Sequence, residues 1–184
     1  AKEVVRLMAA RRMQVPRVVS KGWPVVVEMA ATMPGPPSVV WELITDWEHQ
    51  DDWMLEASDF VVISEHREGI GVEAEATVKI GGISTRDKVT VTGWEPGRRL
   101  AIAHGGWVSG RGEFHLTPLG SDRTHVFWRE ELEPPMGILG AMGLVGFKPV
   151  MKRIFNRDLR VLAGLVRARA SKKTKPSKST SDRV

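Results

Sequence analysis

The sequence predicts an α+β fold in which a curved antiparallel sheet of seven strands wraps around a long C-terminal helix, with two short helices after the first strand. Three observations support this prediction. Residues 59–132 form six short segments in which apolar and polar residues alternate, as in consecutive β-strands. Residues 147–170 carry apolar side chains at helical spacing. An apolar segment at residues 23–33 precedes a proline-rich turn.

The first part of the domain contains one predicted strand and two predicted helices. The strand spans Trp23–Met33 and ends at a Pro-Gly-Pro-Pro turn. A short helix follows at residues 37–45, because proline suits the first helical turn and apolar residues then recur at helical spacing. Asp46 is expected to cap a second short helix. The apolar side of that helix consists of Trp47, Trp53 and Met54.

Six strands are predicted in succession after these helices. So few residues separate them that antiparallel pairing is the only practical connection. In the second strand of this series, Val72, Ala74 and Ala76 share one face and charged residues share the other, which predicts one dry and one wet face. The small alanines leave space that suits a ligand. The six strands span residues 59–65, 72–80, 84–94, 99–107, 112–119 and 124–132.

The final helix is predicted from Phe147 to Ala170. Basic residues occupy the side opposite its apolar stripe, and a helix of about 22 residues, about 33 Å long, is enough to cross the sheet. The stripe therefore covers the dry face. It comprises Val150, Met151, Ile154, Phe155, Leu159, Leu162, Leu165 and Val166.

An uncharged segment with four glycines, residues 136–147, precedes this helix. It is too short to span a bilayer and too glycine-rich to predict a rigid helix. Two interpretations stay open: packing against the mouth of a pocket, or a mobile gate that admits an apolar ligand while touching a membrane. Lys148, Lys152 and Arg153 would assist a transient contact with an anionic membrane surface.

Charge is distributed unevenly along a chain whose formal net charge is +5. Residues 22–151 carry ten Lys and Arg against nineteen Asp and Glu, which argues against a nucleic-acid partner for the domain. The ends are basic. We therefore divide the chain into a basic extension (1–21), a ligand-binding domain (22–170) and a basic tail (171–184) that is expected to be disordered.

Composition excludes several classes of chemistry. The chain has no cysteine, which excludes disulfides, thiol catalysis and thiolate metal sites. Its five histidines are far apart in the sequence, so we expect no metal and no cofactor. No apolar run reaches the roughly 18 residues of a membrane span, and the first residues lack the apolar core of a secretion signal. We expect a cytoplasmic protein, and its oligomeric state stays open.

Three ionisable residues share the apolar parity of their strands and are expected to point inward: Asp87, His104 and Glu130. Asp87 should lie diagonal to His104, within hydrogen-bonding reach. Such a pair would fix the histidine tautomer and leave one ring nitrogen for a ligand or a proton transfer. The alternative is that these residues line a wet pocket mouth and only satisfy one another.

The hairpin around residues 108–110 leaves two registers open. A two-residue loop at Val108 and Ser109 would place Glu113 opposite His104. A three-residue loop turns Phe114 and Leu116 inward instead. We favour the second register because the apolar face of this strand then agrees with that of the next one.

Three segments resemble motifs of the START-like, or SRPBCC, superfamily. Residues 38–46 with Trp53 are similar to its first-helix motif, and residues 93–100 to its turn between the fourth and fifth strands. Residues 128–137 resemble the last strand and closing-helix entry of the polyketide cyclase/dehydrase and lipid-transport branch. The resemblance covers about residues 22–168 and implies a helix-grip fold with a hydrophobic cavity, used in relatives for lipids, polyketides, quinones, plant hormones or aromatic substrates. Fold alone does not determine function.

The sequence therefore predicts a protein that binds a hydrophobic or aromatic small molecule, such as a lipid or polyketide, between sheet and helix. One alternative is a polyketide cyclase or dehydratase-type enzyme in which His104 or Glu130 moves a proton; Asp87 is the third candidate catalytic residue. A second alternative is a toxin-like or regulatory interaction protein, because some small bacterial members resemble this layout. The expected ligand-binding residues are Trp53, Met54, Ala74, Ala76, Val89, Val91, Ile102, His104, Phe114, Trp128, Glu130, Met151 and Phe155.

Overall fold

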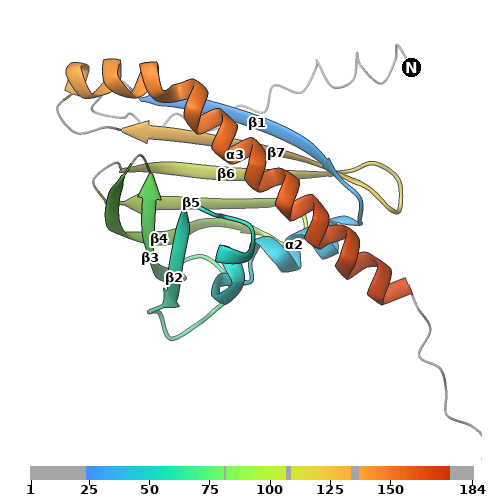
Figure 1. Ribbon diagram of the computed structural model, residues 1–184. Coiled ribbons are helices and arrows are strands. Elements are labelled where there is room, and N and C mark those ends of the chain that lie inside the picture. The colour runs from blue at the N-terminus through green and yellow to red at the C-terminus, as the bar shows by residue number, and fades with distance from the viewer. Residues whose placement is uncertain (1–23, 81, 107–108, 134–136, 175–184) are drawn as a thin grey trace, which may run out of the picture.

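The computed structural model describes residues 24–80, 82–106, 109–133 and 137–174. They form a seven-stranded antiparallel sheet, two short helices after the first strand and one long C-terminal helix (Figure 1). This architecture confirms the predicted fold class. The elements are β1 (Val25–Met33), α2 (Pro37–Ile44), the 3-10 helix η1 (Trp47–Asp52), β2 (Ala57–Val62), β3 (Glu73–Ile80), β4 (Ile83–Glu95), β5 (Arg99–Gly105), β6 (Ser109–Pro118), β7 (Thr124–Glu133) and α3 (Gly137–Thr174).

The strands are ordered β1-β7-β6-β5-β4-β3-β2, so the first and last strands in the chain are neighbours. One row of paired residues crosses most of the sheet: Val25, Leu132, Gly110, His104 and Val89. In β1, β7, β6 and β5 this row lies at the strand ends where β7 stops and α3 begins (Figure 1), whereas in β4 it crosses the middle of the strand. The first turns of α3 and the first four residues of this row therefore share one end of the molecule.

The two short helices form for the reasons that the sequence suggests, with one exception. Pro37 occupies the first turn of α2, which buries Val39, Val40 and Ile44. Asp46 precedes η1 but makes no capping hydrogen bond to its backbone, so that prediction was wrong. Its carboxylate lies 2.9 Å from Nδ1 of His49 instead, because the histidine follows at a spacing that reaches it.

The long helix α3 is the largest difference from the prediction. It begins at Gly137, so the glycine-rich segment is helical, and it ends at Thr174, four residues past the expected end at Ala170. Leu144 and Phe147 pack against the core, which compensates for the low helix propensity of glycine. Within the described residues, neither α3 nor any other helix combines the length and the apolar character of a membrane span.

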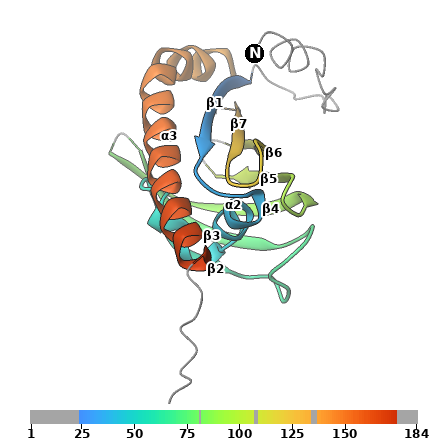
Figure 2. The ribbon, with the colours of Figure 1, turned by 90° about the vertical axis from the view of Figure 1, so that its right-hand side faces the viewer.

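Helix α3 bends in its N-terminal third, where Pro149 lies inside the helix (Figures 1 and 2). Proline removes one helical hydrogen bond and commonly causes such bends. Past the bend, α3 runs down across the concave side of the sheet (Figure 2). Val150 is 45% exposed and does not belong to the buried stripe, because its neighbour Met151 occupies the inward position and each helical residue is rotated by about 100°.

The core fills the space between the sheet and α3. Leu159, Leu162 and Val166 of α3 are almost completely buried, as are Val126 and Trp128 of β7. The approach is close at the turn after β1, where a Cβ on Gly35 would lie 2.6 Å from Val166 Cγ1. Helix and sheet are therefore in direct contact at this end.

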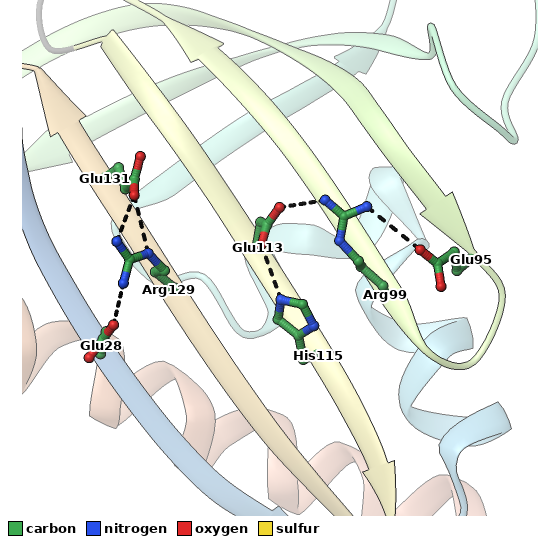
Figure 3. Close-up of polar contacts among 7 residues, drawn as sticks. All are labelled: Glu28, Glu95, Arg99, Glu113, His115, Arg129 and Glu131. Atoms are coloured by element: carbon green, nitrogen blue, oxygen red, sulfur yellow. Dashed lines mark hydrogen bonds and ion pairs between the residues drawn. The ribbon is translucent and has the colours of Figure 1, made fainter. Parts of the chain in front are cut away.

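The outer face of the sheet carries ionic networks across neighbouring strands (Figure 3). Arg129 of β7 pairs with Glu28 of β1 and, at 2.7 Å, with Glu131. Arg99 of β5 pairs with Glu113 of β6. The outward face is thus charged and largely self-compensated.

Glu113 has the most perturbed carboxylate of this outer face. His115 lies 3.1 Å from it, and the hydrogen bonds from His115 and then from Arg99 lower the pKa of Glu113 to about 2. Burial acts in the opposite direction. The carboxylate therefore stays ionised over the whole physiological range.

Candidate functional site

Four aromatic residues of the predicted binding site form one cluster between the sheet and α3. Phe114 and Trp128 stack with ring centroids 4.8 Å apart, and Phe155 of α3 lies 4.9 Å from Trp128. Trp53 meets both sheet aromatics edge-on, at 6.0 and 6.1 Å. These side chains form an apolar wall in the middle of the interior.

The remaining predicted binding residues differ in their burial. Ala74, Ala76, Val91 and Met151 are buried, as the inward parity requires. Met54, Val89, Ile102 and His104 are only half-buried. Burial thus separates a covered part of the inner face from a less covered part, and the role of these residues in ligand binding stays a prediction.

The less covered part lies on β4 and β5. Asp87 and Val89 of β4 and Ile102 and His104 of β5 share the inward parity, and all four are half-buried. We call these four residues the open patch. The inward residues of β7 are buried by contrast, as are Val91 of β4 and Leu100 of β5, so the partial exposure on β4 and β5 is confined to the stretch that carries these four residues.

Glu130 of β7 connects the open patch to the aromatic cluster. Its Oε1 accepts a hydrogen bond of 2.6 Å from Nε1 of Trp128. Its Oε2 lies 3.2 Å from Nε2 of His104. The Glu130 side chain is 7% exposed and that of His104 16% exposed, so the pair is held in a largely desolvated setting.

This contact spans β6, which lies between β5 and β7 in the sheet. The inward positions of β6 at this level are Gly110, opposite His104, and Gly112, opposite Glu130. A Cβ at Gly110 would lie 2.9 Å from Cε1 of His104, and one at Gly112 would lie 2.5 Å from Oε1 of Glu130. Two glycines therefore create the space in which side chains two strands apart can meet.

Asp87 lies over a third glycine, because a Cβ at Gly106 would overlap its Oδ1 atom. Since Val89 pairs with His104, Asp87 is diagonal to the histidine, as expected. Among the described residues, Glu130 is the carboxylate that contacts the histidine ring. The Asp87 Oδ1 atom is buried and has no hydrogen-bond partner within the described part of the chain.

For the hairpin between β5 and β6, the sequence predicted that Phe114 and Leu116 face inward, and the structure confirms this. Phe114 and Leu116 are buried on the inner side. His104 pairs with Gly110 and not with Glu113, so the register of the two-residue loop was wrong. The alternation of apolar residues determines which side chains of β6 face inward. A register shift by two positions keeps the same side chains inward, so the sequence pattern cannot reveal it.

The arrangement can hold and move a proton. A carboxylate has only acceptors, so the contact with Glu130 assigns a hydrogen to Nε2 of His104. Glu130 thereby fixes the ring orientation, and Asp87 offers an acceptor atom to which no other described residue hydrogen-bonds. The described residues contain no group of three or more His, Cys, Asp or Glu placed to hold a metal ion.

A pair of buried carboxylates, Glu56 and Asp158, was not predicted from the sequence. Glu56 precedes β2 and Asp158 lies on the inward side of α3; both carboxylates contact Nη2 of Arg157 at 3.2 Å. Burial, and next the charge of Asp158, raise the pKa of Glu56 to about 8. Burial also raises the pKa of Asp158. The available signal was the position of Asp158 three residues after Phe155, on the apolar stripe.

A small open pocket of about 100 Å³ lies outside the interior, between α2, η1 and the end of α3. It is lined by Leu43, Asp46, His49, Asp52, Leu165 and Arg169. The hydrogen bond with Asp46 raises the pKa of His49. None of the predicted site residues lies there, so this pocket is separate from the candidate site.

The fold and the inner face define a class of protein. A seven-stranded sheet that cups one long C-terminal helix and places polar side chains on its apolar inner face is the START-like helix-grip architecture. Residues 24–167 match the family model described as "Polyketide cyclase / dehydrase and lipid transport". The chain belongs to this family.

Solved structures with the same fold are diverged in sequence. TTHA0849 from Thermus thermophilus is 20% identical with a TM-score of 0.66, covering 79% of this chain and 99% of that one. A START superfamily protein from Mycobacterium smegmatis is 18% identical with a TM-score of 0.61, covering 81% and 99%. The Zhui aromatase/cyclase from Streptomyces sp. R1128 is 16% identical with a TM-score of 0.63, covering 85% and 99%. No curated protein matches the chain.

Proposed function

We propose that this protein binds a hydrophobic or aromatic small molecule against the inner face of its sheet, with the open patch as the point of recognition. The observation that carries the proposal is the half-burial of Asp87, Val89, Ile102 and His104 on an interior face that is covered at β7. Apolar surface that stays accessible inside a folded domain is typical of ligand sites.

The polar atoms of the patch define the chemistry of the ligand. Asp87 Oδ1 is a buried acceptor that has no partner among the residues that the structure describes, and leaving such an atom unpaired costs about 1–3 kcal/mol. A hydroxyl or phenol group on the ligand would donate to it. The adjacent Val89 and Ile102 would contact an apolar body. We therefore propose a mainly apolar molecule with at least one hydrogen-bond donor.

Family membership supports the same ligand class, because the family description names polyketide cyclases and lipid transport. The Zhui protein, described as an aromatase/cyclase, shares the fold at low identity. Both point to apolar or aromatic molecules, and neither distinguishes a carrier from an enzyme.

Native mass spectrometry of the purified protein, followed by denaturing extraction, tests the binding proposal. We expect a stoichiometric apolar adduct, or a thermal shift with members of a lipid and polyketide panel. Asp87→Ala and Ile102→Ser should weaken that binding by at least about tenfold, on the scale of one lost buried contact. Lys88→Ala, on the outer side of β4, is the matched control. A clean apo mass with no thermal shift across the panel would contradict the proposal.

A second candidate function is proton transfer in a cyclase or dehydratase-type reaction. The observation that favours it is the desolvated contact between His104 and Glu130, which joins a proton donor to a carboxylate beside the open patch. His104→Ala should then abolish turnover of a polyketide substrate while much of the ligand affinity remains. If wild-type protein binds the same compounds without converting them, the carrier function stands alone.

A further inference from the structure

The N-terminal third of α3 exposes apolar side chains on its outward side. Met142 is 68% exposed, Val145 57% and Val150 45%. Pro149 is also exposed, and Met142, Val145 and Pro149 follow one another at helical spacing on one stripe. The opposite side of the same segment packs on the core through Leu144 and Phe147. This part of α3 is thus apolar on both sides.

Basic residues continue the outward stripe. Lys148, Lys152 and Arg153 are exposed next to the apolar residues. From Gly137 to Arg157 the helix contains Lys and Arg but no Asp or Glu, and its first acidic residue is the buried Asp158. Residues 22–151 as a whole are rich in acids, so an anionic surface is attracted to α3, whose exposed basic residues begin on this face and continue toward its C-terminal end.

The position of this face connects it to the candidate site. Helix α3 begins at the end of the sheet that carries Gly110 and His104 (Figure 1). The bend near Pro149 separates the first turns from the part of α3 that crosses the sheet (Figure 2). A surface in contact with the first turns therefore lies at the end of the molecule that carries His104 of the open patch.

We propose that the outward face of residues 142–153, defined by Met142, Val145, Val150, Lys148, Lys152 and Arg153, docks on the surface of an anionic lipid bilayer. An interfacial helix buries apolar side chains among the headgroups and places basic side chains beside them. A nucleic acid would use the basic residues and leave Met142 and Val145 in water. The combination of exposed apolar and basic residues without acids favours the bilayer.

Flotation of the full chain with lipid vesicles tests this inference and requires no ligand, so its result is independent of the proposed function. We expect binding to vesicles of phosphatidylcholine mixed with phosphatidylglycerol, and much weaker binding to phosphatidylcholine alone. The variant Met142→Asp/Val145→Asp should bind the anionic vesicles at least about tenfold more weakly, because two apolar anchors are lost. Lys152→Glu/Arg153→Glu should lose a similar factor on anionic vesicles only.

Ile70→Asp is the matched control, because Ile70 is 66% exposed in the β2–β3 connection and should not affect binding. All substituted residues are exposed, and circular dichroism with a urea midpoint verifies that each variant is folded. Vesicle binding that survives Met142→Asp/Val145→Asp would overturn the proposal, since the basic ends of the chain would then account for it. Absence of wild-type binding, or a dimer that the same variant dissociates, would also overturn it.

Discussion

The two faces of β5, β6 and β7 use charged residues in opposite ways. On the outer face, Arg99, Glu113 and Arg129 are partly exposed and find partners on neighbouring strands (Figure 3). On the inner face, His104 and Glu130 interrupt an apolar surface and meet only where β6 has glycines. An exposed ion pair needs no special space, whereas a buried polar group needs both a partner and room for it. The inner face is therefore the one that substitution should damage.

Gly110→Ala should have the largest effect. Its Cβ would overlap the backbone oxygen of Glu131 and would also meet the His104 ring. A backbone atom cannot rotate away, so we expect a loss of about 3 kcal/mol in the free energy of unfolding, measured by urea denaturation.

Gly105→Ala provides the control for this substitution. A Cβ at Gly105, on the adjacent strand, would meet nothing within 4 Å. We expect its stability to stay within about 0.5 kcal/mol of wild type. If Gly110→Ala and Gly105→Ala changed the free energy of unfolding equally, the empty space beside His104 would not be what makes Gly110 necessary.

Glu130→Ala should have the next largest effect, about 2 kcal/mol. It leaves the buried Nε1 of Trp128 and the ring of His104 without their shared acceptor. Glu131→Ala removes a carboxylate from the next residue, on the outer face, and should cost less than about 1 kcal/mol. Thermal denaturation of both variants checks the difference. A larger loss for Glu131→Ala would reverse the proposed ranking of the two faces.

The sequence was sufficient to predict the architecture because apolar parity is a local property. Alternation in Val72, Ala74 and Ala76 and the helical stripe around Leu159 and Leu162 each report which side of an element is buried, and the structure agrees. The start of α3 was missed because helix propensity predicts against the glycine-rich segment. Packing of Leu144 and Phe147 on the core compensates for that propensity, and such packing is not visible in a single segment.

Within the candidate site, parity identified the inward positions of Asp87, His104 and Glu130 but not their pairing. Pairing depended on the absence of side chains at Gly110 and Gly112 and on the register of β5 and β6, which the alternation of apolar residues does not determine. The contact between Glu56 and α3 involves residues about a hundred positions apart. No local pattern encodes a contact of that kind, so it required the folded chain.

The free energy of unfolding, measured as a function of pH, should distinguish the buried carboxylate of Glu56 from the exposed carboxylates of the outer face. Glu56 has an unfolded pKa near 4.5 and a folded pKa of about 8, so the folded state binds the extra proton between these values. Its stabilising contribution is complete below the unfolded pKa and is lost as pH rises through about 8. We expect Glu56→Gln, which stays neutral, to flatten this part of the curve.

Urea denaturation at several pH values measures this effect, with the exposed Glu68→Gln as the control that keeps the wild-type slope. If Glu56→Gln and wild type lose stability in parallel between about pH 4.5 and 8, the raised pKa of Glu56 does not contribute.

The smallest effect is expected on the outer face. The pair of Glu28 and Arg129 is about as exposed as surface ion pairs that contribute about 0.2–1 kcal/mol. A double-mutant cycle with Glu28→Ala and Arg129→Ala should therefore give a coupling energy below about 0.5 kcal/mol that disappears in high salt, because screening acts on exposed charges. The coupling of His104 and Glu130, measured in the same way, should be larger and nearly insensitive to salt, since both side chains are mostly buried. Equal salt sensitivity of the two couplings would mean that solvent screens the contact of His104 and Glu130 as it screens an exposed ion pair, and that contact would then not be desolvated.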